Sequence, residues 1–299
     1  MLRIGIDLGG TNIAAGVVDD GCNIVGRGSV PTALPRTAGE IADAIADAAR
    51  LALDAAGVTM DDIASVGVGT PGAVNAQGVV ENDANLGFQN TPLRALVEER
   101  LGKPTRVYND ANCAALGEQI AGAGRGARNF IAVTLGTGIG GGIIIDGKLL
   151  TGVNGAAGEI GHMVIDHQGI PCKCGRIGCF EQYASATALI RDAREKGLDV
   201  AGARDIFELA KSDNLIALEV LDSYYDYLST GLSNLINIFQ PEIICLGGGV
   251  AGQGDYLLEP LCRKIEEKRY TKNSEKQTEI KIAELGNDAG IIGAAMGEF

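Results

Sequence analysis

The stretch IGIDLGGTNIAAGVVDDG, residues 4–21, decides the fold because its pattern returns as FIAVTLGTGIGGGIIIDG at residues 130–147. Each stretch contains an apolar strand, a turn of glycine and threonine, a second apolar strand and a closing Asp-Gly turn, which is the pattern of a β-hairpin. A hairpin that opens each half of a 299-residue chain predicts two similar domains that face each other across a central cleft.

Strands and helices are predicted to alternate along the rest of the chain. The pattern predicts strands at residues 2–7, 13–18, 63–68, 105–107, 130–135, 142–145 and 243–246. It predicts helices at about 39–56 and 93–101, from 112 onward, and at 187–196, 203–211 and 214–239, with the run Gly247-Gly248-Gly249 opening a further helix. This alternation predicts an α/β fold with a largely parallel sheet.

Charge and apolar content exclude several classes of protein. The chain has 25 basic and 38 acidic residues, which gives a net charge of −13. Binding to nucleic acid or to an anionic membrane depends on clustered Lys and Arg, which the sequence lacks, so neither partner is expected. The most apolar stretch, residues 130–145, is too short to span a membrane and is interrupted by five glycines. With no secretory signal at the N-terminus, we expect a soluble cytoplasmic protein.

Glycine is unusually frequent, at 44 of 299 residues, and is predicted to serve tight turns and close approaches to ligands. Two turns, Gly9-Gly10-Thr11-Asn12 and Gly136-Thr137-Gly138, lie where the hairpins bend and would expose backbone N–H groups to phosphate oxygens. Asp7 lies just before the first turn, where a Mg²⁺–nucleotide complex needs a carboxylate, directly or through water. Gly248 and Gly249 form a weaker third candidate. For any one of these turns alone, an ordinary turn without a ligand is the alternative.

Asn109-Asp110 follows a short strand and opens a helix. Asn and Asp routinely cap helix N-termini, and this is one interpretation of the pair. A carboxylate at the carboxyl end of a strand is also where α/β folds bind their ligands. The sequence alone favours neither interpretation.

The spacing of Cys172, Cys174 and Cys179 predicts a structural zinc site. Three thiols in a C-x-C-x4-C pattern cannot all form disulfides with one another, and His162 would complete a tetrahedral Cys₃His set. His167 is the competing fourth ligand. Glu159 and Glu181 flank this segment and could accept hydrogen bonds from hydroxyl groups, although either one alone would pass as a surface acid. The other four cysteines are expected to pack as small apolar residues.

Seven motifs occur in the order found in the ROK family (repressors, open reading frames and kinases), which the chain resembles from its first strand to its C-terminus. They are DLGGTN at residues 7–12, GTPG at 69–72, NLG at 85–87, NDANCAALGE at 109–118, LGTGIGGG at 135–142, GEIGH at 158–162 and CKCGRIGCFE at 172–181. The resemblance implies two actin-like (ribonuclease H-like) ATPase domains around a central cleft. It places a small domain at 1–120, completed by a C-terminal helix at about 289–299, and a large domain with a zinc-binding loop at 121–288.

The resemblance is strongest to the bacterial glucokinases of this family, and it implies ATP-dependent phosphorylation of glucose to glucose 6-phosphate with Mg²⁺ and structural Zn²⁺. Asp110 is then the general base. The hydroxyl-binding residues would be Asn85, Asn109, Asp110, Glu159, His162 and Glu181. The nucleotide-binding residues would be Asp7, Gly9, Gly10, Thr11, Asn12, Gly136, Thr137, Gly138, Gly248 and Gly249, and the zinc ligands His162, Cys172, Cys174 and Cys179.

Two alternatives stay open. The first is a kinase of the same family for fructose, N-acetylmannosamine, N-acetylglucosamine or allose, because Phe88 stands where many members have Trp or Tyr. The second is a non-catalytic regulator of the family. It is disfavoured by the negative charge and by the phosphate turn starting near residue 7, which leaves no room for a preceding helix-turn-helix. The family further implies a homodimer or homotetramer.

Overall fold

The computed structural model describes residues 1–83 and 85–297 of the chain, which divide into two compact units. The first unit comprises residues 1–128, 142–158 and 284–299, and the second comprises residues 129–141 and 159–283. Segment 142–158, which the family resemblance places in the large domain, groups with the first unit in the structure. In the described part of the chain, no helix combines the length and apolar character that a bilayer-spanning helix needs.

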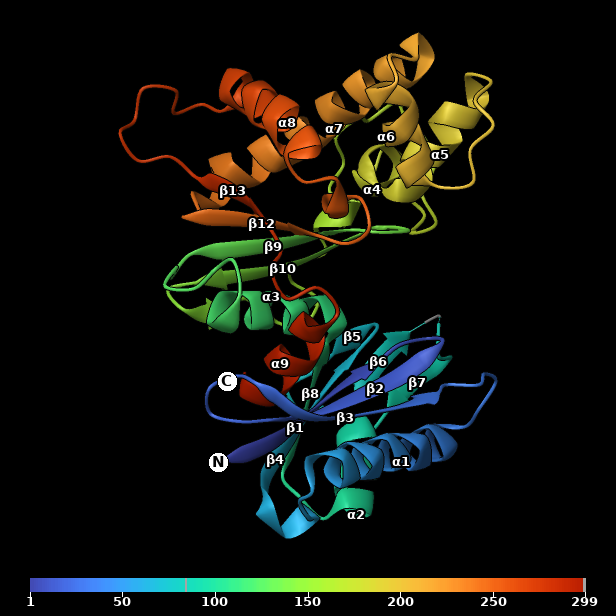
Figure 1. The fold of residues 1–299 in the computed structure, drawn as a ribbon, viewed down its shortest axis with the longest axis vertical. Coiled ribbons are helices and arrows are strands. Elements are labelled where there is room, and N and C mark those ends of the chain that lie inside the picture. The colour runs from blue at the N-terminus through green and yellow to red at the C-terminus, as the bar shows by residue number, and fades with distance from the viewer. Residues whose placement is uncertain (84, 298–299) are drawn as a thin grey trace. The chain divides into compact units, whose positions relative to one another are not determined.

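The first unit is built on a five-stranded sheet in the order β3-β2-β1-β4-β8 (Figure 1). Its strands are β1 (Leu2–Leu8), β2 (Asn12–Val18), β3 (Ile24–Pro31), β4 (Ile63–Thr70) and β8 (Thr105–Asn109). β1 to β3 form antiparallel pairs, whereas β1, β4 and β8 run parallel to one another. A small antiparallel sheet adds β5 (Ala73–Val74), β6 (Val80–Asp83) and β7 (Phe88–Thr91).

The second sheet has the order β11-β10-β9-β12-β13, which repeats the topology of the first. Its strands are β9 (Phe130–Leu135), β10 (Ile139–Ile145), β11 (Lys148–Leu149), β12 (Ile243–Gly247) and β13 (Glu279–Ile282). β9, β12 and β13 are parallel, and β10 pairs with β11 antiparallel. The predicted repeat of a hairpin followed by parallel strands is therefore confirmed.

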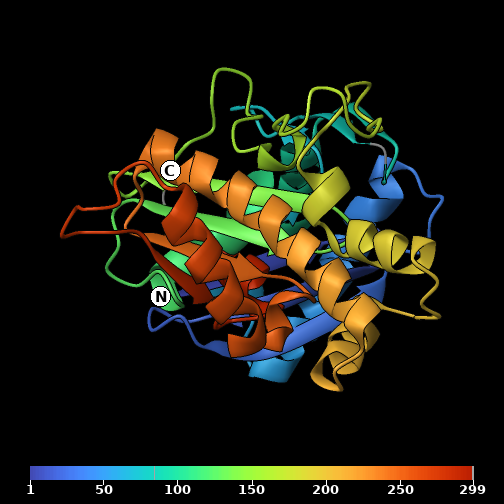
Figure 2. The ribbon, with the colours of Figure 1, turned by 90° about the horizontal axis from the view of Figure 1, so that it is seen from above.

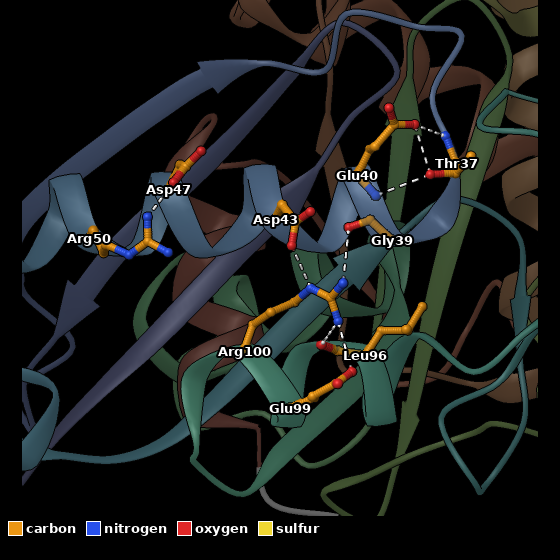
Figure 3. Close-up of polar contacts among 9 residues, drawn as sticks. All are labelled: Thr37, Gly39, Glu40, Asp43, Asp47, Arg50, Leu96, Glu99 and Arg100. Carbon is orange, nitrogen blue, oxygen red and sulfur yellow. Dashed lines mark hydrogen bonds and ion pairs between the residues drawn. The ribbon is translucent and has the colours of Figure 1, made fainter.

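Helices α1 (Ala38–Ala56) and α2 (Leu93–Leu101) cover one face of the first sheet (Figure 1). Thr37 and Glu40 form a capping box at the start of α1, and Gly57 ends the helix in the left-handed conformation. Arg100 joins the two helices, because its guanidinium donates to a carboxylate oxygen of Asp43 at 2.8 Å and to carbonyl oxygens of both helices (Figure 3).

Helix α9 (Asp288–Met296) packs against β1 and β4 and against α3 (Asp110–Ala121), and glycines make this close approach possible. A Cβ on Gly67 of β4 would lie 1.8 Å from the carbonyl oxygen of Ala294, and one on Gly293 would lie 1.8 Å from that of Cys113. Since both distances are far below van der Waals contact, the backbones themselves are in contact. The expectation that the glycines serve turns and ligand contacts is therefore wrong for these positions.

The buried carboxylate of Glu118 in α3 fixes two further segments of the first unit. Its oxygens accept hydrogen bonds from the N–H groups of Ala123 at 2.9 Å, Glu284 at 3.1 Å and Leu285 at 2.8 Å. The chain passes from the first unit to the second shortly after Ala123 and returns at Glu284. The Glu118 side chain therefore holds the backbone near the end of segment 1–128 and at the start of the segment that begins at Glu284.

The helices of the second unit follow the cysteine-rich loop and pack mainly on one another. They are α4 (Glu181–Ala184), α5 (Ala186–Glu195), α6 (Ala203–Lys211), α7 (Leu215–Phe239) and α8 (Asp255–Lys268). The long helix α7 lies alongside α8 (orange and red-orange in Figure 2). Asn214 caps the start of α7, and its end at Gln240, in the left-handed conformation, is followed by Pro241.

Most predicted elements are present, and one of them is displaced. The run Gly247-Gly248-Gly249 does not open a helix directly, because the short 3₁₀ turn Ala251–Gln253 follows it and α8 begins only at Asp255. Strands β3, β5, β6, β7, β11 and β13 and helix α4 were not predicted.

Candidate active site

The carboxyl ends of the parallel strands β1, β4 and β8 bring acidic and amide side chains to one edge of the first sheet. In the strand register Asp7 lies beside Gly69, and Thr70 lies beside Asn109. Asp110 follows directly as the first residue of α3. This edge is where α/β sheets bind their ligands, and the sequence assigns a role in catalysis or binding to three of these residues.

The charge of Asp110 affects the ionisation of Asp7. Burial and, to a lesser degree, the nearby charge of Asp110 together raise the pKa of Asp7 from its usual 3.8 to about 6. Burial likewise raises the pKa of Asp110, and the carboxylate of Asp83 adds to this increase. Mg²⁺ prefers hard oxygen ligands, so the half-buried carboxylate of Asp7 at this edge suits the predicted Mg²⁺ site.

The structure confirms the capping interpretation for Asn109, whereas ligand binding by Asp110 stays a prediction. The Asn109 side-chain oxygen caps α3 by accepting from the N–H groups of Ala111 at 2.9 Å and Asn112 at 3.2 Å. Its amide nitrogen donates to the carbonyl oxygen of Gly72 at 3.2 Å. The Asn109 side chain also forms a hydrogen bond with the Asp110 carboxylate, which partly offsets the effect of burial on the pKa of Asp110.

The predicted hydroxyl-binding residue Asn85 lies on a turn held by Asp83. The buried Asp83 carboxylate accepts from the N–H groups of Asn85 at 3.1 Å and Leu86 at 2.5 Å, and the Asn85 side chain is exposed. Phe88 is only 2% exposed and belongs to the hydrophobic core of the first unit. Its ring therefore packs inside the unit.

In each of the two predicted phosphate turns, the N–H of the first glycine closes the turn, across four residues in the first and three in the second. In the first unit the N–H of Gly9 donates to the carbonyl oxygen of Asn12 at 3.0 Å, and in the second the N–H of Gly136 donates to that of Gly138 at 3.1 Å. A Cβ on Gly10 or on Gly136 would meet no atom within 4 Å. Each turn therefore leaves room at its glycine for a phosphate group to approach the backbone.

The run Gly247–Gly249 lies against the end of β9 in the second unit. Gly248 has a φ of +84°, and a Cβ there would lie 2.5 Å from the carbonyl oxygen of Leu135, whereas a Cβ on Gly249 would meet nothing within 4 Å. The backbone at Gly248 therefore contacts Leu135, which directly precedes the predicted phosphate turn at Gly136.

His162, Cys172, Cys174 and Cys179 form a cluster suited to a metal ion. Their ligand atoms all lie within 4.8 Å of one another, with 3.5 Å between the sulfurs of Cys174 and Cys179 and 3.7 Å between Cys172 Sγ and His162 Nδ1. Tetrahedral zinc with ligands at about 2.3 Å places them about 3.8 Å apart, so this donor set fits zinc. The competing ligand His167 is not part of this group in the described chain.

The loop that carries the cysteines is held by its own backbone and by α4. The N–H of Cys172 donates to the carbonyl oxygen of Arg176 at 2.8 Å, and a hydrogen bond from the backbone of Arg176 is the main cause that lowers the pKa of Cys174 to about 7. The Tyr183 hydroxyl accepts from the N–H of Ile170 at 2.7 Å. A low thiol pKa favours the thiolate, which is the form that binds metal, whereas burial raises the pKa of Cys172 and of Cys179.

Comparison with known proteins gives the family. The model of the ROK family matches residues 3–296. The chain belongs to the ROK family. A glucokinase of Halalkalibacterium halodurans is 40% identical over 306 aligned residues, which cover 97% of this chain and 92% of that protein.

Two solved ROK structures resemble the chain over almost its whole length. One is a ROK family glucokinase from Streptomyces griseus in complex with glucose and AMPPNP, at a TM-score of 0.83 and 36% identity, covering 99% of this chain and 98% of the other. The other is the ROK hexokinase from Thermus thermophilus, at a TM-score of 0.83 and 38% identity, covering 99% and 97%. The fold is therefore the actin-like ATPase fold, as the motifs predicted.

The predicted ROK site residues fall on both units. The first unit holds Asp7, Gly9, Gly10, Thr11, Asn12, Asn85, Asn109 and Asp110, and the second holds Gly136, Thr137, Gly138, Glu159, His162, Cys172, Cys174, Cys179, Glu181, Gly248 and Gly249. Within each unit the structure brings Asp7 near Asp110, and Glu181 near His162 and Cys172.

Sequence reasoning missed two supporting residues of this site. Asp83 holds the turn of Asn85 and raises the pKa of Asp110. Thr32, which is fully buried, donates from its hydroxyl to the carbonyl oxygen of Gly9 at 2.6 Å and so holds the first phosphate turn. Neither residue belongs to a spaced motif, so a local pattern gives no signal for them.

Proposed function

We propose that the protein is an ATP-dependent hexose kinase that transfers a phosphoryl group to the 6-hydroxyl of glucose. The pair of half-buried aspartates at the carboxyl edge of the first sheet is the observation that carries this proposal. The likeness to glucokinases over nearly the full chain supports it.

Asp110 acts as the general base in this proposal. Its carboxylate would accept the proton of the 6-hydroxyl as that oxygen attacks, and the raised pKa makes it a stronger base than an exposed aspartate. One oxygen of Asp110 already accepts from the N–H of Ala111 at 2.8 Å, which fixes the orientation of the carboxyl group. Mg²⁺ and ATP, when bound, supply the phosphoryl group and offset the charge that develops during transfer.

The remaining assigned residues bind the two substrates. Backbone N–H groups of the turns at Gly9–Asn12 and Gly136–Gly138 would bind phosphate oxygens, with Asp7 as the acid that serves Mg²⁺ directly or through water and Gly248 and Gly249 lining the nucleotide. The other hexose hydroxyls would bind to Asn85, Asn109, Glu159, His162 and Glu181. Zinc on His162, Cys172, Cys174 and Cys179 would order the loop that carries three of them.

A coupled assay of ADP release with Mg²⁺ and ATP tests the proposal against a panel of glucose, mannose, fructose, allose, N-acetylglucosamine and N-acetylmannosamine. Glucose is expected to give the highest kcat/KM. If another sugar leads, Asp110 keeps its role and the substrate is corrected. If no sugar is phosphorylated, the kinase proposal fails.

A regulator without activity is the second candidate within the family. It would need a lost base or a lost phosphate turn, and Asp110 and both turns are present in this chain. We also propose that the protein works in the cytoplasm and that it forms a homodimer or homotetramer. Light scattering of the purified protein tests the oligomeric state.

A further inference from the structure

The carboxylate of Glu181 lies between the metal cluster and the second phosphate turn. Its Oε1 atom is 3.2 Å from Cys172 Sγ and 3.7 Å from His162 Nδ1. Its Oε2 atom is 2.7 Å from the position that a Cβ on Gly138 would take. Glu181 therefore contacts the cluster through Oε1. Its Oε2 occupies the space that a side chain at position 138 would need.

The segments that carry Glu159, His162 and Glu181 also contact this turn through the backbone. The N–H of Ala186, just after α4, donates to the carbonyl oxygen of Gly136 at 2.8 Å. A Cβ on Gly161 would lie 2.2 Å from the carbonyl oxygen of Ile139, the residue that follows the turn. Both segments thus pack directly against residues 136–139.

We propose that Gly138 is a positioning residue for the hexose, because its missing side chain leaves the space in which the Glu181 carboxylate is held. The sequence assigns Gly138 to the nucleotide, and the geometry adds this second role. The inference rests on the proposed function, in which Glu181 binds a hexose hydroxyl. It makes the residue at position 138 a determinant of hexose affinity even in the absence of nucleotide.

An alanine at position 138 should move Glu181 rather than unfold the protein. Gly138 does not have a φ in the left-handed region, so its backbone conformation is open to alanine. The atom in the way is the far end of a flexible side chain, which can turn aside at little expense to stability. The carboxylate would then leave its place beside Cys172 and His162.

The test compares Gly138→Ala with the matched control Gly136→Ala, which adds a methyl group to the same turn where nothing lies within 4 Å. Glucose affinity is measured by calorimetry without nucleotide. We expect Gly138→Ala to weaken it about tenfold, the loss for a displaced charged hydrogen-bond partner. Gly136→Ala is expected to change glucose affinity less than twofold, whatever its effect on nucleotide.

Two further measurements separate displacement of Glu181 from general damage. In a Glu181→Asp background the shorter side chain leaves room for a methyl group, so the effect of Gly138→Ala should fall to about twofold or less. In protein loaded with Co²⁺ in place of zinc, Gly138→Ala should alter the visible absorption of the metal–thiolate cluster, and Gly136→Ala should not. This spectrum requires no hexose.

The outcomes separate the two proposals. If the unmodified protein binds glucose and Gly138→Ala binds it equally well, the inference is wrong and the proposed function stands. If the unmodified protein binds no hexose, the proposed function fails, and the Co²⁺ spectra alone decide whether Gly138 positions Glu181. Unchanged spectra, or an equal effect of Gly138→Ala in both Glu181 backgrounds, would refute the inference. If Gly138→Ala does not fold, the double variant Gly138→Ala/Glu181→Asp should fold, because the shorter carboxylate no longer occupies the space of the methyl group. Failure of the double variant to fold would also refute the inference.

Discussion

Replacing Asp7 by Asn should stabilise the protein in the absence of nucleotide and Mg²⁺, and the gain should depend on pH. Burial and the charge of Asp110 raise the pKa of Asp7 from 3.8 to about 6. Between these two values the folded protein binds more protons than the unfolded chain, so the stability of the unmodified protein falls as the pH rises through this window. Above pH 6 the destabilisation is complete, and it is absent well below pH 3.8.

The size of the expected stability difference follows from the shift in the pKa of Asp7. One pKa unit is equivalent to 1.36 kcal/mol, so ionised Asp7 lowers the free energy of unfolding by about 3 kcal/mol at pH 8 and by about 1 kcal/mol at pH 4.5. Asparagine does not titrate. The advantage of Asp7→Asn over the unmodified protein should therefore grow by about 2 kcal/mol between these pH values, whatever constant difference the amide group adds.

Urea unfolding followed by circular dichroism at pH 4.5, 6 and 8 measures this difference. Asp61→Asn, which removes an exposed carboxylate of the same unit, controls for the change in net charge. A difference between Asp7→Asn and the unmodified protein that is the same at all three pH values would refute the reasoning. The variant is also expected to lose most kinase activity, since asparagine lacks the carboxylate that Asp7 would offer to Mg²⁺.

Four other substitutions test separate parts of the argument. Asp110→Ala should lower kcat by about 10²–10⁴-fold while calorimetry still detects hexose binding, and unchanged turnover would overturn the assignment. In the unmodified protein, kcat/KM should fall as the pH drops through the pKa of Asp110, which is raised above the usual 3.8. Cys172→Ser should lose bound zinc, measured by elemental analysis, and weaken hexose binding, and a zinc-free variant of full affinity would contradict this. Glu118→Ala should lower the free energy of unfolding by about 2–4 kcal/mol in urea, because three backbone N–H groups lose their acceptor. Arg100→Met should lower it by only about 1 kcal/mol or less, since Asp43 and Glu99 are largely exposed, and a larger loss would show that the contact between α1 and α2 is underestimated.

The parts of the fold that the sequence predicts are those encoded by local patterns. The helix at 203–211 has the predicted bounds, and the strand at 130–135 does as well, because apolar period and flanking glycines define such elements. Strand β3 (Ile24–Pro31) was missed since its two glycines and its arginine weaken the strand pattern. Its place is set by pairing with β2, which is a tertiary contact.

In the candidate site as well, local patterns predict some features, and tertiary contacts set the others. The cluster of His162, Cys172, Cys174 and Cys179 could be predicted because ligand type and spacing are local, and the structure brings the four together. The influence of Asp83 on Asp110, and the space for Glu181 at Gly138, arise between residues 27 and 43 positions apart and leave no trace in local spacing. The ring of Phe88, which stands where many family members have Trp or Tyr, lies in the hydrophobic core of the first unit.

The repeated hairpins explain why the predicted chemistry differs between the units. IGIDLG at residues 4–9 and IAVTLG at residues 131–136 have the same buried pattern, and at the equivalent position Asp7 lies beside Gly69 whereas Thr134 lies beside Gly247. The scaffold is thus the same, but only the first copy carries a carboxylate at this point. A second carboxylate there would add negative charge beside a phosphate turn, whereas a hydroxyl can donate to phosphate oxygens. The duplicated fold therefore fits the proposed acid–base and Mg²⁺ roles of the first unit and the proposed zinc site of the second, with a predicted phosphate turn in each.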